Sequence, residues 1–262
     1  MNEQIKTIDS IQQVITRTIA TEAPGENLLL VGGFRYRLLN NSIRLSTDID
    51  YHFNGNLSQK RTELLSLFKR RLIPEVKRTF GFDGTVDEMP SPNESESKTI
   101  GLAFYNLEKS IGRIEIPIDL TKITFIDKPE TRTINGTIYL TVSDADMVES
   151  KILALLLRVY KQERDLIDLF LFKSSLADNV SQRLHQKMSK LGLALRDLEK
   201  LIASLKDNRS RHIKVLNQIL ETQVEEGAQQ AIKMGGGAGS IFDTVLSVLQ
   251  DSYNRIKKEP IL

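Results

Sequence analysis

The sequence predicts an α+β domain that is followed by a bundle of helices. Up to residue 142, short runs of β-branched and aromatic residues alternate with helical patterns, whereas from Ser143 onward every pattern is helical. The 262 residues are enough for one large domain or for two of ordinary size. The change of pattern therefore divides the chain into an α+β domain at 1–143 and a helical domain at 144–262.

Local patterns predict the elements of the first domain. Isoleucines at helical spacing indicate the first helix, a short apolar run indicates a buried strand, and Gly32-Gly33 turns the chain from that strand into a short helix. After a second strand, Ser58 is the expected N-cap of a long helix. The expected helices span 3–22, 32–41 and 58–80, and the expected strands span 28–31, 48–53, 82–87, 99–107, 113–120 and 137–142, with loops at 91–97 and 108–112.

The second domain is expected to contain helices alone. They span 144–162, 164–177, 180–205, 208–233 and 240–258. The glycine-rich run 235–239 separates the last two. We interpret it as a flexible linker and not as a phosphate-binding loop, because such loops usually follow a strand.

Composition excludes several classes of protein. The chain has no cysteine, which excludes disulfides and thiolate metal sites, and it has no apolar run long enough to cross a membrane. The first residues lack the apolar core of a signal peptide, so we expect a cytoplasmic protein without membrane partners. The net charge of +2 is uninformative, but the basic helix segment 69–78 permits a nucleic-acid partner without requiring one.

Two aspartates follow the glycine turn. Asp48 and Asp50 alternate with Ile49 and Tyr51 in a predicted strand, so both carboxylates point to one face. Two like charges at so short a separation repel each other, and a divalent cation bound between them removes the repulsion. Mg²⁺ prefers carboxylate oxygens and often completes its shell with substrate phosphates. The pattern therefore predicts a site for a metal and a nucleotide, although Asp-x-Asp pairs also occur on solvated strand edges.

A third carboxylate is expected on the strand at 113–120. Its isoleucines face one side, while Glu115 and Asp119 face the other. Either Asp119 or Glu115 is a candidate to join Asp48 and Asp50 in holding one or two Mg²⁺ ions for nucleotidyl or phosphoryl transfer. The alternative is a polar face that is turned to solvent.

The helices carry a second group of charges. Lys151 and Arg158 are seven residues apart and share a helix face, and Asp165 and Asp168 are three apart on the next helix. These residues either form a solvated face or supply a lysine that reaches triphosphate oxygens.

In this order and spacing, the motifs resemble those of the AbiEii/AbiGii toxin family. They are Gly32-Gly33, Arg44-x-Ser46-x-Asp48-Ile49-Asp50, Lys151-x6-Arg158 and Arg164-Asp165-x2-Asp168-Leu169, and the resemblance covers about residues 27–175. It implies a polymerase-β-like nucleotidyltransferase domain with an appended helical domain. It also implies a toxin of a toxin–antitoxin or abortive-infection system. Related MenT toxins add nucleotides to the acceptor end of tRNA.

The resemblance also assigns roles to residues. Gly32 and Gly33 would grip phosphates, Asp48 and Asp50 would bind metal, Lys151 would contact nucleotide, and Asp165, or else Asp168, would be the downstream catalytic acid. From the residues themselves we also expect Asp119, or else Glu115, to be the third metal-binding and catalytic carboxylate, and Arg44, Ser46 and Arg158 to be nucleotide-binding residues. One departure is Phe34, which stands where the family favours threonine. Arg35, Arg37 and Arg44 lie near the glycine turn and are either phosphate-neutralising or ordinary surface arginines.

The sequence thus predicts a nucleotidyltransferase that uses Mg²⁺ (or Mn²⁺) and an NTP. The expected acceptor is an RNA, with tRNA favoured, or a protein hydroxyl, and an antitoxin is an expected partner. Two alternatives belong to other classes. One is a non-catalytic nucleotide- or RNA-binding protein that retains the fold, and the other is a module whose helical bundle engages a protein partner.

Overall fold

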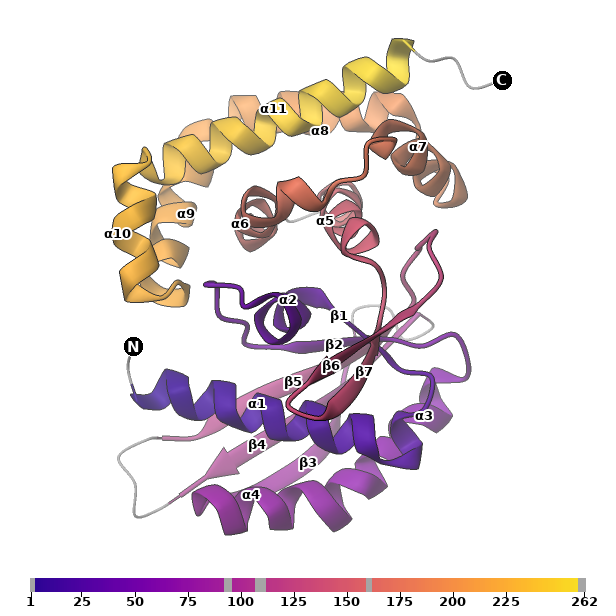
Figure 1. Cartoon of the computed structure of the whole chain (residues 1–262), viewed down its shortest axis with the longest axis vertical. Coiled ribbons are helices and arrows are strands. Elements are labelled where there is room, and N and C mark those ends of the chain that lie inside the picture. The colour runs from indigo at the N-terminus through magenta and orange to yellow at the C-terminus, as the bar shows by residue number, and fades with distance from the viewer. Residues whose placement is uncertain (1–2, 92–95, 107–111, 159–161, 259–262) are drawn as a thin grey trace. The chain divides into compact units, whose positions relative to one another are not determined.

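A computed structural model of the protein describes residues 3–91, 96–106, 112–158 and 162–258 (Figure 1). The chain forms two compact units. The first unit comprises Met1–Ile123 and Pro129–Val142, and the second comprises Thr124–Lys128 and Ser143–Leu262. The chain therefore enters the second unit briefly, returns to complete the first, and then leaves it after Val142.

A seven-stranded mixed sheet forms the centre of the first unit, in the order β3-β4-β5-β2-β1-β7-β6. Strand β2 runs antiparallel to β1 and parallel to β5, and β1 runs parallel to β7. The strands are β1 (Leu29–Val31), β2 (Ile49–His52), β3 (Asp83–Met89), β4 (Ser97–Tyr105), β5 (Ile114–Thr121), β6 (Glu130–Ile134) and β7 (Thr137–Thr141).

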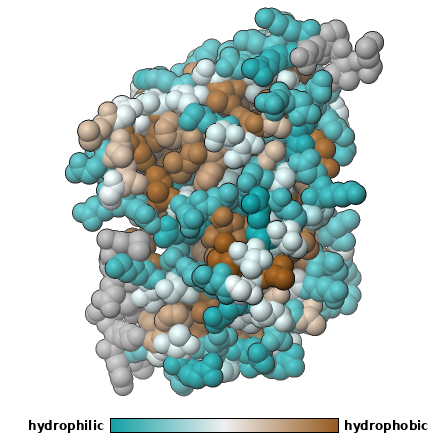
Figure 2. Space-filling view, viewed as in Figure 1, coloured by the Kyte–Doolittle hydropathy of each residue, from teal (hydrophilic) through white to brown (hydrophobic). Residues whose placement is uncertain are grey.

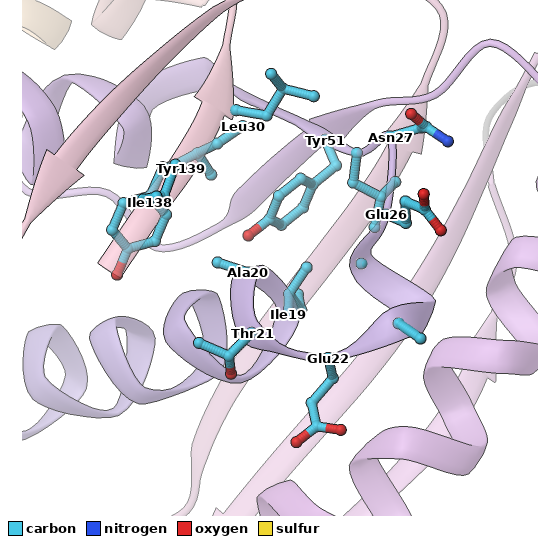
Figure 3. A pocket seen from close by; sticks show the side chains of 14 residues that line it. Ile19, Ala20, Thr21, Glu22, Glu26, Asn27, Leu30, Tyr51, Ile138 and Tyr139 are labelled. Carbon is cyan, nitrogen blue, oxygen red and sulfur yellow. The ribbon is translucent and has the colours of Figure 1, made fainter. Parts of the chain in front are cut away.

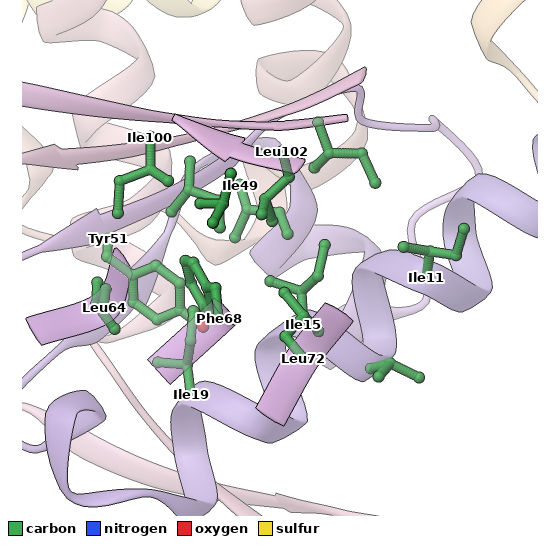
Figure 4. Close-up of a cluster of buried hydrophobic side chains, with 14 of the residues drawn as sticks. Ile11, Ile15, Ile19, Ile49, Tyr51, Leu64, Phe68, Leu72, Ile100 and Leu102 are labelled. Atoms are coloured by element: carbon green, nitrogen blue, oxygen red, sulfur yellow. The ribbon is translucent and has the colours of Figure 1, made fainter. Parts of the chain in front are cut away.

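Helices α1, α3 and α4 cover one face of this sheet (Figure 1). Their apolar side chains pack with those of the strands in a single buried cluster, which Figure 4 shows around Ile15, Phe68 and Leu72. On β2, Ile49 and Tyr51 belong to this cluster, so the intervening Asp50 lies on the other face. The helical elements are α1 (Glu3–Thr21), η1 (Ala23–Gly25), α2 (Gly32–Asn40), α3 (Leu57–Leu67), the π-helical turn η2 (Phe68–Leu72) and α4 (Ile73–Phe80).

Seven α-helices and one 3-10 turn form the described part of the second unit. The long helix α11 packs against α6, α7, α8 and α9, and its buried residues include Ile241, Val245 and Leu249. The elements are α5 (Asp144–Leu157), α6 (Glu163–Phe172), η3 (Lys173–Ser175), α7 (Val180–Lys190), α8 (Leu195–Asp207), α9 (Arg209–Gln223), α10 (Glu226–Met234) and α11 (Gly237–Lys258).

A buried carboxylate ties Thr124–Lys128 to the second unit. The backbone N–H groups of Ile126 and Asp127 donate to the two oxygens of Asp146, at 3.0 and 2.9 Å. Arg183 bridges Asp127, Asp146 and Glu149 at 2.6 to 3.0 Å. Buried charges are tolerated in proteins when they are paired in this way.

Several elements differ from those that the sequence predicts. Asn56 rather than Ser58 caps α3, since its side chain accepts from the N–H of Gln59 at 3.1 Å. The helices expected at 180–205 and 208–233 are each divided into two, and only two residues separate α10 from α11, so the expected linker at 235–239 is mostly helical. Strand β6 was not predicted. Most of the expected turn at 108–112 and most of the loop at 91–97 lie outside the described residues.

The surface is mainly hydrophilic on the face that Figure 2 shows, with smaller hydrophobic areas between the polar residues. Within the described ranges, no helix combines the length and the apolar character that a membrane crossing requires.

Candidate active site

The turn between β1 and α2 brings the backbone close to two polar side chains. Gly32 has a left-handed backbone with a φ of +75°, and a Cβ atom there would lie 1.8 Å from Oδ2 of Asp50. A Cβ atom on Gly33 would lie 2.7 Å from Oγ of Ser46 and 2.5 Å from Nη2 of Arg44. A side chain at Gly32 would displace Asp50, and one at Gly33 would displace the ends of Arg44 and Ser46, which are residues that the sequence singles out.

Strand pairing places the carboxylates that follow this turn. Asp50 is opposite Val31 of β1 on one side and opposite Asp119 of β5 on the other. Because β2 and β5 are parallel and in register here, Asp50 and Asp119 point to the same face of the sheet. Asp48 immediately precedes β2, and its Oδ1 accepts a hydrogen bond from Ser46 Oγ at 2.8 Å.

Asp119 has a second neighbour that the sequence does not reveal. Thr99 pairs with Asp119 across β4 and β5, and its hydroxyl donates to Oδ1 of Asp119 at 2.6 Å. The other candidate, Glu115, lies four residues earlier on β5. Its side chain is 68% exposed to solvent and forms an ion pair with Arg113 at 2.8 Å. Asp119 is therefore the candidate that the register brings next to Asp50.

The described residues do not gather three Asp, Glu, His or Cys side chains closely enough to hold a metal ion. The donor chemistry nevertheless fits Mg²⁺, because Asp50 and Asp119 supply hard oxygen ligands in register on one face. The absence of a Cβ atom at Gly32 also keeps the space beside Oδ2 of Asp50 open.

His52 lies on the same face of β2 as Asp50, two residues further on. It is buried, and its Nδ1 accepts a hydrogen bond from the backbone N–H of Ile123 at 2.8 Å. Burial, and to a smaller extent the charge of Lys122, lowers the pKa of this imidazole below its ordinary value. The neutral ring therefore acts as an acceptor that fixes the chain just after β5.

The arginines near the glycine turn hold α2 in place. Arg35 is fully buried, and it donates to Oγ1 of Thr141 and to the carbonyl of Val142, both at 3.1 Å. Arg37 pairs with Asp9 of α1 at 3.1 Å. Arg44 is also buried. These contacts give Arg35 and Arg37 structural roles in place of the phosphate contacts considered from the sequence.

Phe34 belongs to the hydrophobic core and is 0% exposed. The residue that departs from the pattern of the resembled family is thus a packing residue of α2. The polar groups that the turn itself offers to a ligand are then its backbone N–H groups at the start of α2, which favour anions.

In the second unit, Lys151 contacts both candidate acids of the next helix. Its Nζ lies 3.1 Å from Oδ1 of Asp165 and 2.9 Å from Oδ2 of Asp168. Arg158 also forms an ion pair with Asp165. Lys151 and both aspartates are buried. The solvated face considered from the sequence is therefore wrong for these three residues, and the geometry gives Asp165 and Asp168 equal access to Lys151.

Comparisons with known proteins identify the family of the chain. Residues 13–247 match the family described as Nucleotidyl transferase AbiEii toxin, Type IV TA system. None of the curated proteins that were compared with the chain matches it.

Solved structures share the fold. A candidate nucleotidyltransferase from H. pylori superposes with a TM-score of 0.58 at 12% identity over 100% of both chains. JHP933 from Helicobacter pylori gives a TM-score of 0.54 at 13% identity over 98% of both. The nucleotidyltransferase toxin MenT4 from Mycobacterium tuberculosis gives 0.54 at 15% identity, over 97% of this chain and 91% of its own.

The first unit thus has a nucleotidyltransferase fold, and helices follow it in the second unit. The family match covers most of the chain, including the glycine turn, the aspartates of β2 and β5, and Lys151. The chain belongs to the AbiEii family of nucleotidyl transferase toxins.

Proposed function

We propose that this protein transfers a nucleoside monophosphate from an NTP to the 3′-hydroxyl of an RNA, with tRNA as the favoured acceptor, in a reaction that depends on Mg²⁺ (or Mn²⁺). The observation that carries the proposal is the register of Asp50 with Asp119 beside the glycine turn. The likeness to a nucleotidyltransferase toxin, MenT4, supports the same class of reaction.

The metal would be held by Asp48, Asp50 and Asp119. When bound, Mg²⁺ would neutralise charge on the triphosphate and orient it for in-line attack. The chain prepares these ligands through two hydroxyl groups: Ser46 orients Asp48, and Thr99 orients Asp119. Both hydrogen bonds fix a carboxylate before the substrate arrives, which reduces the reorganisation that the reaction requires.

The glycine turn would bind the triphosphate. Backbone N–H groups of Gly32 and Gly33 open α2, where the helix dipole favours phosphate oxygens. Arg44 and Ser46 lie against Gly33 and would support this loop as the nucleotide binds. The acceptor hydroxyl would attack the α-phosphorus, a new P–O bond would form, and pyrophosphate would leave. Asp119 would align the attacking hydroxyl and help to remove its proton.

The second unit would contribute Lys151 as a nucleotide ligand, with Arg158 and the acid Asp165 beside it. The support for this assignment is the ion-paired group itself, because Asp165 and Asp168 hold the ammonium of Lys151 in a fixed position. A preorganised cation is the side chain that phosphoryl-transfer sites use to stabilise charge.

The experiment uses the full chain, Mg²⁺, total tRNA and each of the four NTPs, labelled at the α- or the γ-phosphate. Transfer of α-label with release of pyrophosphate is the expected result, whereas transfer of γ-label would identify a kinase. The control is Asp48→Ala. If the wild type labels no RNA, or if Asp48→Ala labels it equally well, the proposed activity is wrong.

The same samples distinguish the expected partners. NTP-dependent thermal stabilisation without transfer to tRNA would leave a nucleotide-binding protein, and label on a protein band would identify a protein acceptor. We propose a cytoplasmic location because nucleotides and tRNA are available there, and an antitoxin encoded with the chain because the family is described as part of a type IV system.

A further inference from the structure

A cavity of about 290 Å³ in the first unit is lined by residues of β3, β4 and β5, and we call it the β4 cavity. Its lining includes the small residues Gly101 and Ala103 of β4 and Pro117 of β5. Pro117 is two residues before Asp119 on β5, where both alternate with buried isoleucines. The two side chains therefore point to the same face of the sheet, which is the face that carries the candidate carboxylates.

Strand pairing sets the separation between the β4 cavity and Asp119. Gly101 stands opposite Pro117, and Thr99 stands opposite Asp119, two residues further along the same pair of strands. Two residues of an antiparallel strand span about 6.8 Å. A single nucleoside bridges such a distance, with a hydroxyl of its ribose at Asp119 and its base over Gly101.

The order of the strands puts the β4 cavity and the glycine turn on opposite sides of the carboxylates. Across the sheet, β3 and β4 line the cavity, β5 and β2 carry Asp119 and Asp50, and β1 leads into Gly32. In-line transfer needs the attacking hydroxyl and the leaving pyrophosphate on opposite sides of the phosphorus. With the triphosphate at the glycine turn, the acceptor approaches from the side of β4.

The lining suits a base better than a phosphate. Met89 of β3 is 44% exposed, and a Cβ atom at Gly101 would lie 2.5 Å from its Sδ, so the thioether lies over this glycine. A polarizable thioether packs well against a flat ring. Arg113 and Glu115 neutralise each other in an ion pair, which leaves Asp87 as the unbalanced charge of the lining. Its carboxylate disfavours phosphate oxygens but not an uncharged base.

A different cavity of the unit provides a contrast. It has a volume of about 310 Å³ and lies between the end of α1 and strands β1, β2 and β7 (Figure 3), and we call it the α1 cavity. Tyr51 lines it and belongs to the hydrophobic core, on the face of β2 opposite to Asp50. The sheet thus separates the α1 cavity from the carboxylates, and an acceptor bound there would not reach Asp119.

We propose that the β4 cavity binds the 3′-terminal base of the acceptor RNA and so places the terminal hydroxyl beside Asp119. The base packs on Met89 and Pro117, while the triphosphate lies on the other side of the carboxylates. This inference rests on the proposed nucleotidyl transfer and adds to it the position of the acceptor end.

The test compares two synthetic RNAs that copy the acceptor end of the tRNA labelled by the wild type. One ends in a normal nucleotide, and the other ends in an abasic ribose, which keeps the 3′-hydroxyl but has no base. The KM of each RNA and the KM of the NTP are measured with the full chain. The normal RNA is expected to have a KM about 5- to 10-fold lower than the abasic RNA, because partial burial of one ring contributes about that much.

Ala103→Leu should fill the β4 cavity. The KM of the normal RNA should then rise to that of the abasic RNA, while the KM of the NTP stays unchanged. Ala20→Leu is the matched control, because it makes the same substitution in the α1 cavity and should keep the wild-type ratio of the two KM values. A ratio that persists in Ala103→Leu, or that is lost equally in Ala20→Leu, would overturn the inference. Melting curves establish that both variants fold.

Met89→Ala decides the question if Ala103→Leu does not fold, because Met89 is exposed on the edge strand β3. It should raise the KM of the normal RNA several-fold and leave that of the abasic RNA nearly unchanged. Met234→Ala, at an 88% exposed methionine of α10, is the control. An unchanged KM for the normal RNA in Met89→Ala would contradict packing of the base on this side chain.

The outcomes also separate this inference from the proposed function. If the wild type transfers no label to any RNA, the proposed function fails and the acceptor site fails with it. If the wild type labels both RNAs with equal KM values, the transfer reaction stands and the binding of the terminal base in the β4 cavity is wrong.

Discussion

Asp50 and Asp119 stand opposite each other in register on the parallel strands β2 and β5. Adjacent parallel strands are about 4.8 Å apart, so the two carboxylates are close neighbours on one face. Two negative charges at such a separation destabilise the fold by an amount on the order of 1–3 kcal/mol near a protein surface. A divalent cation bound by both carboxylates would remove this repulsion.

Asp50→Asn should therefore stabilise the metal-free protein and inactivate it. Removing one of the two charges is expected to raise the melting temperature by about 2–4 °C per kcal/mol, while transferase activity falls at least ~100-fold. The measurement is a melting curve with and without Mg²⁺, together with the tRNA-labelling assay. Mg²⁺ should raise the melting temperature of the wild type and leave that of the variant unchanged. A metal-free variant that melts below the wild type would contradict the repulsion.

Gly32→Ala should impair activity more than its backbone strain alone explains. Gly32 and Gly136 have nearly the same positive φ, +75° and +76°, but a Cβ atom meets Asp50 at the first position and nothing within 4 Å at the second. Both alanine variants should lose about 1 kcal/mol of stability from the backbone. Only Gly32→Ala should displace the carboxylate and lose most of the activity. Equal activity of the two variants would show that the close approach is unimportant.

The stability of the first unit should fall as the pH falls below about 6.5, because of His52. Its pKa is lowered in the fold by burial, so the unfolded chain takes up a proton first as the pH decreases through the ordinary value of 6.5. The loss of stability begins near pH 6.5 and is complete below the lowered pKa that His52 has in the folded state. His52→Gln keeps an acceptor for the N–H of Ile123 and should flatten this part of the curve.

The measurement for His52 is chemical unfolding between pH 4.5 and 8, and His185→Gln on α7 is the control for removing an imidazole elsewhere. The difference in the free energy of unfolding between wild type and His52→Gln should be constant above pH 7 and should change only at lower pH. A pH-independent difference would mean that burial of this ring does not oppose its protonation.

Lys151→Met should destabilise the second unit, because it leaves the buried carboxylates of Asp165 and Asp168 without this cation. Breaking such a pair usually costs about 3–5 kcal/mol. Lys151→Arg keeps the charge and should retain more of the stability. If Lys151 also binds nucleotide, Lys151→Arg should still lower the transfer rate in a folded protein. Full activity of Lys151→Arg would leave the lysine with a structural role alone.

Alternation along a single strand could be predicted from the sequence, whereas the neighbours of a strand could not. The Asp-x-Asp pattern predicted that both aspartates lie on one face of a strand; Asp50 does lie on the face of β2 opposite to Ile49 and Tyr51, but Asp48 lies just before the strand. Nothing local distinguished Asp119 from Glu115, because both lie on the polar face of β5. The choice depends on the parallel pairing of β2 with β5, which joins distant parts of the chain. For the same reason Thr99 was not recognised as a partner of Asp119.

Two other features could not be predicted because they depend on which residues the fold buries. Strand β6 was missed because it lies at the edge of the sheet and its residues are mostly exposed, so it lacks the apolar alternation of a half-buried strand. The spacing placed Lys151 on α5 and Asp165 and Asp168 on α6 correctly, but Arg158, which was expected on the same helix as Lys151, follows the end of α5 with an extended backbone. The burial of Lys151, Asp165 and Asp168 as ion pairs depends on how α5 packs against α6, and helical periodicity in the sequence does not predict that packing.

The order of strands has a consequence for synthesis of the protein on the ribosome. Strand β1 can pair with β2 soon after both strands have emerged. Its other neighbour, β7, is among the last parts of the first unit to be made. Thr141 donates to the carbonyl of Leu30 at 2.7 Å and accepts from Arg35 of α2. Until Thr141 has emerged, β1 keeps one unpaired edge and α2 lacks the hydrogen bond from Arg35 to Thr141. We therefore expect chains that end before Thr141 to lack the complete sheet.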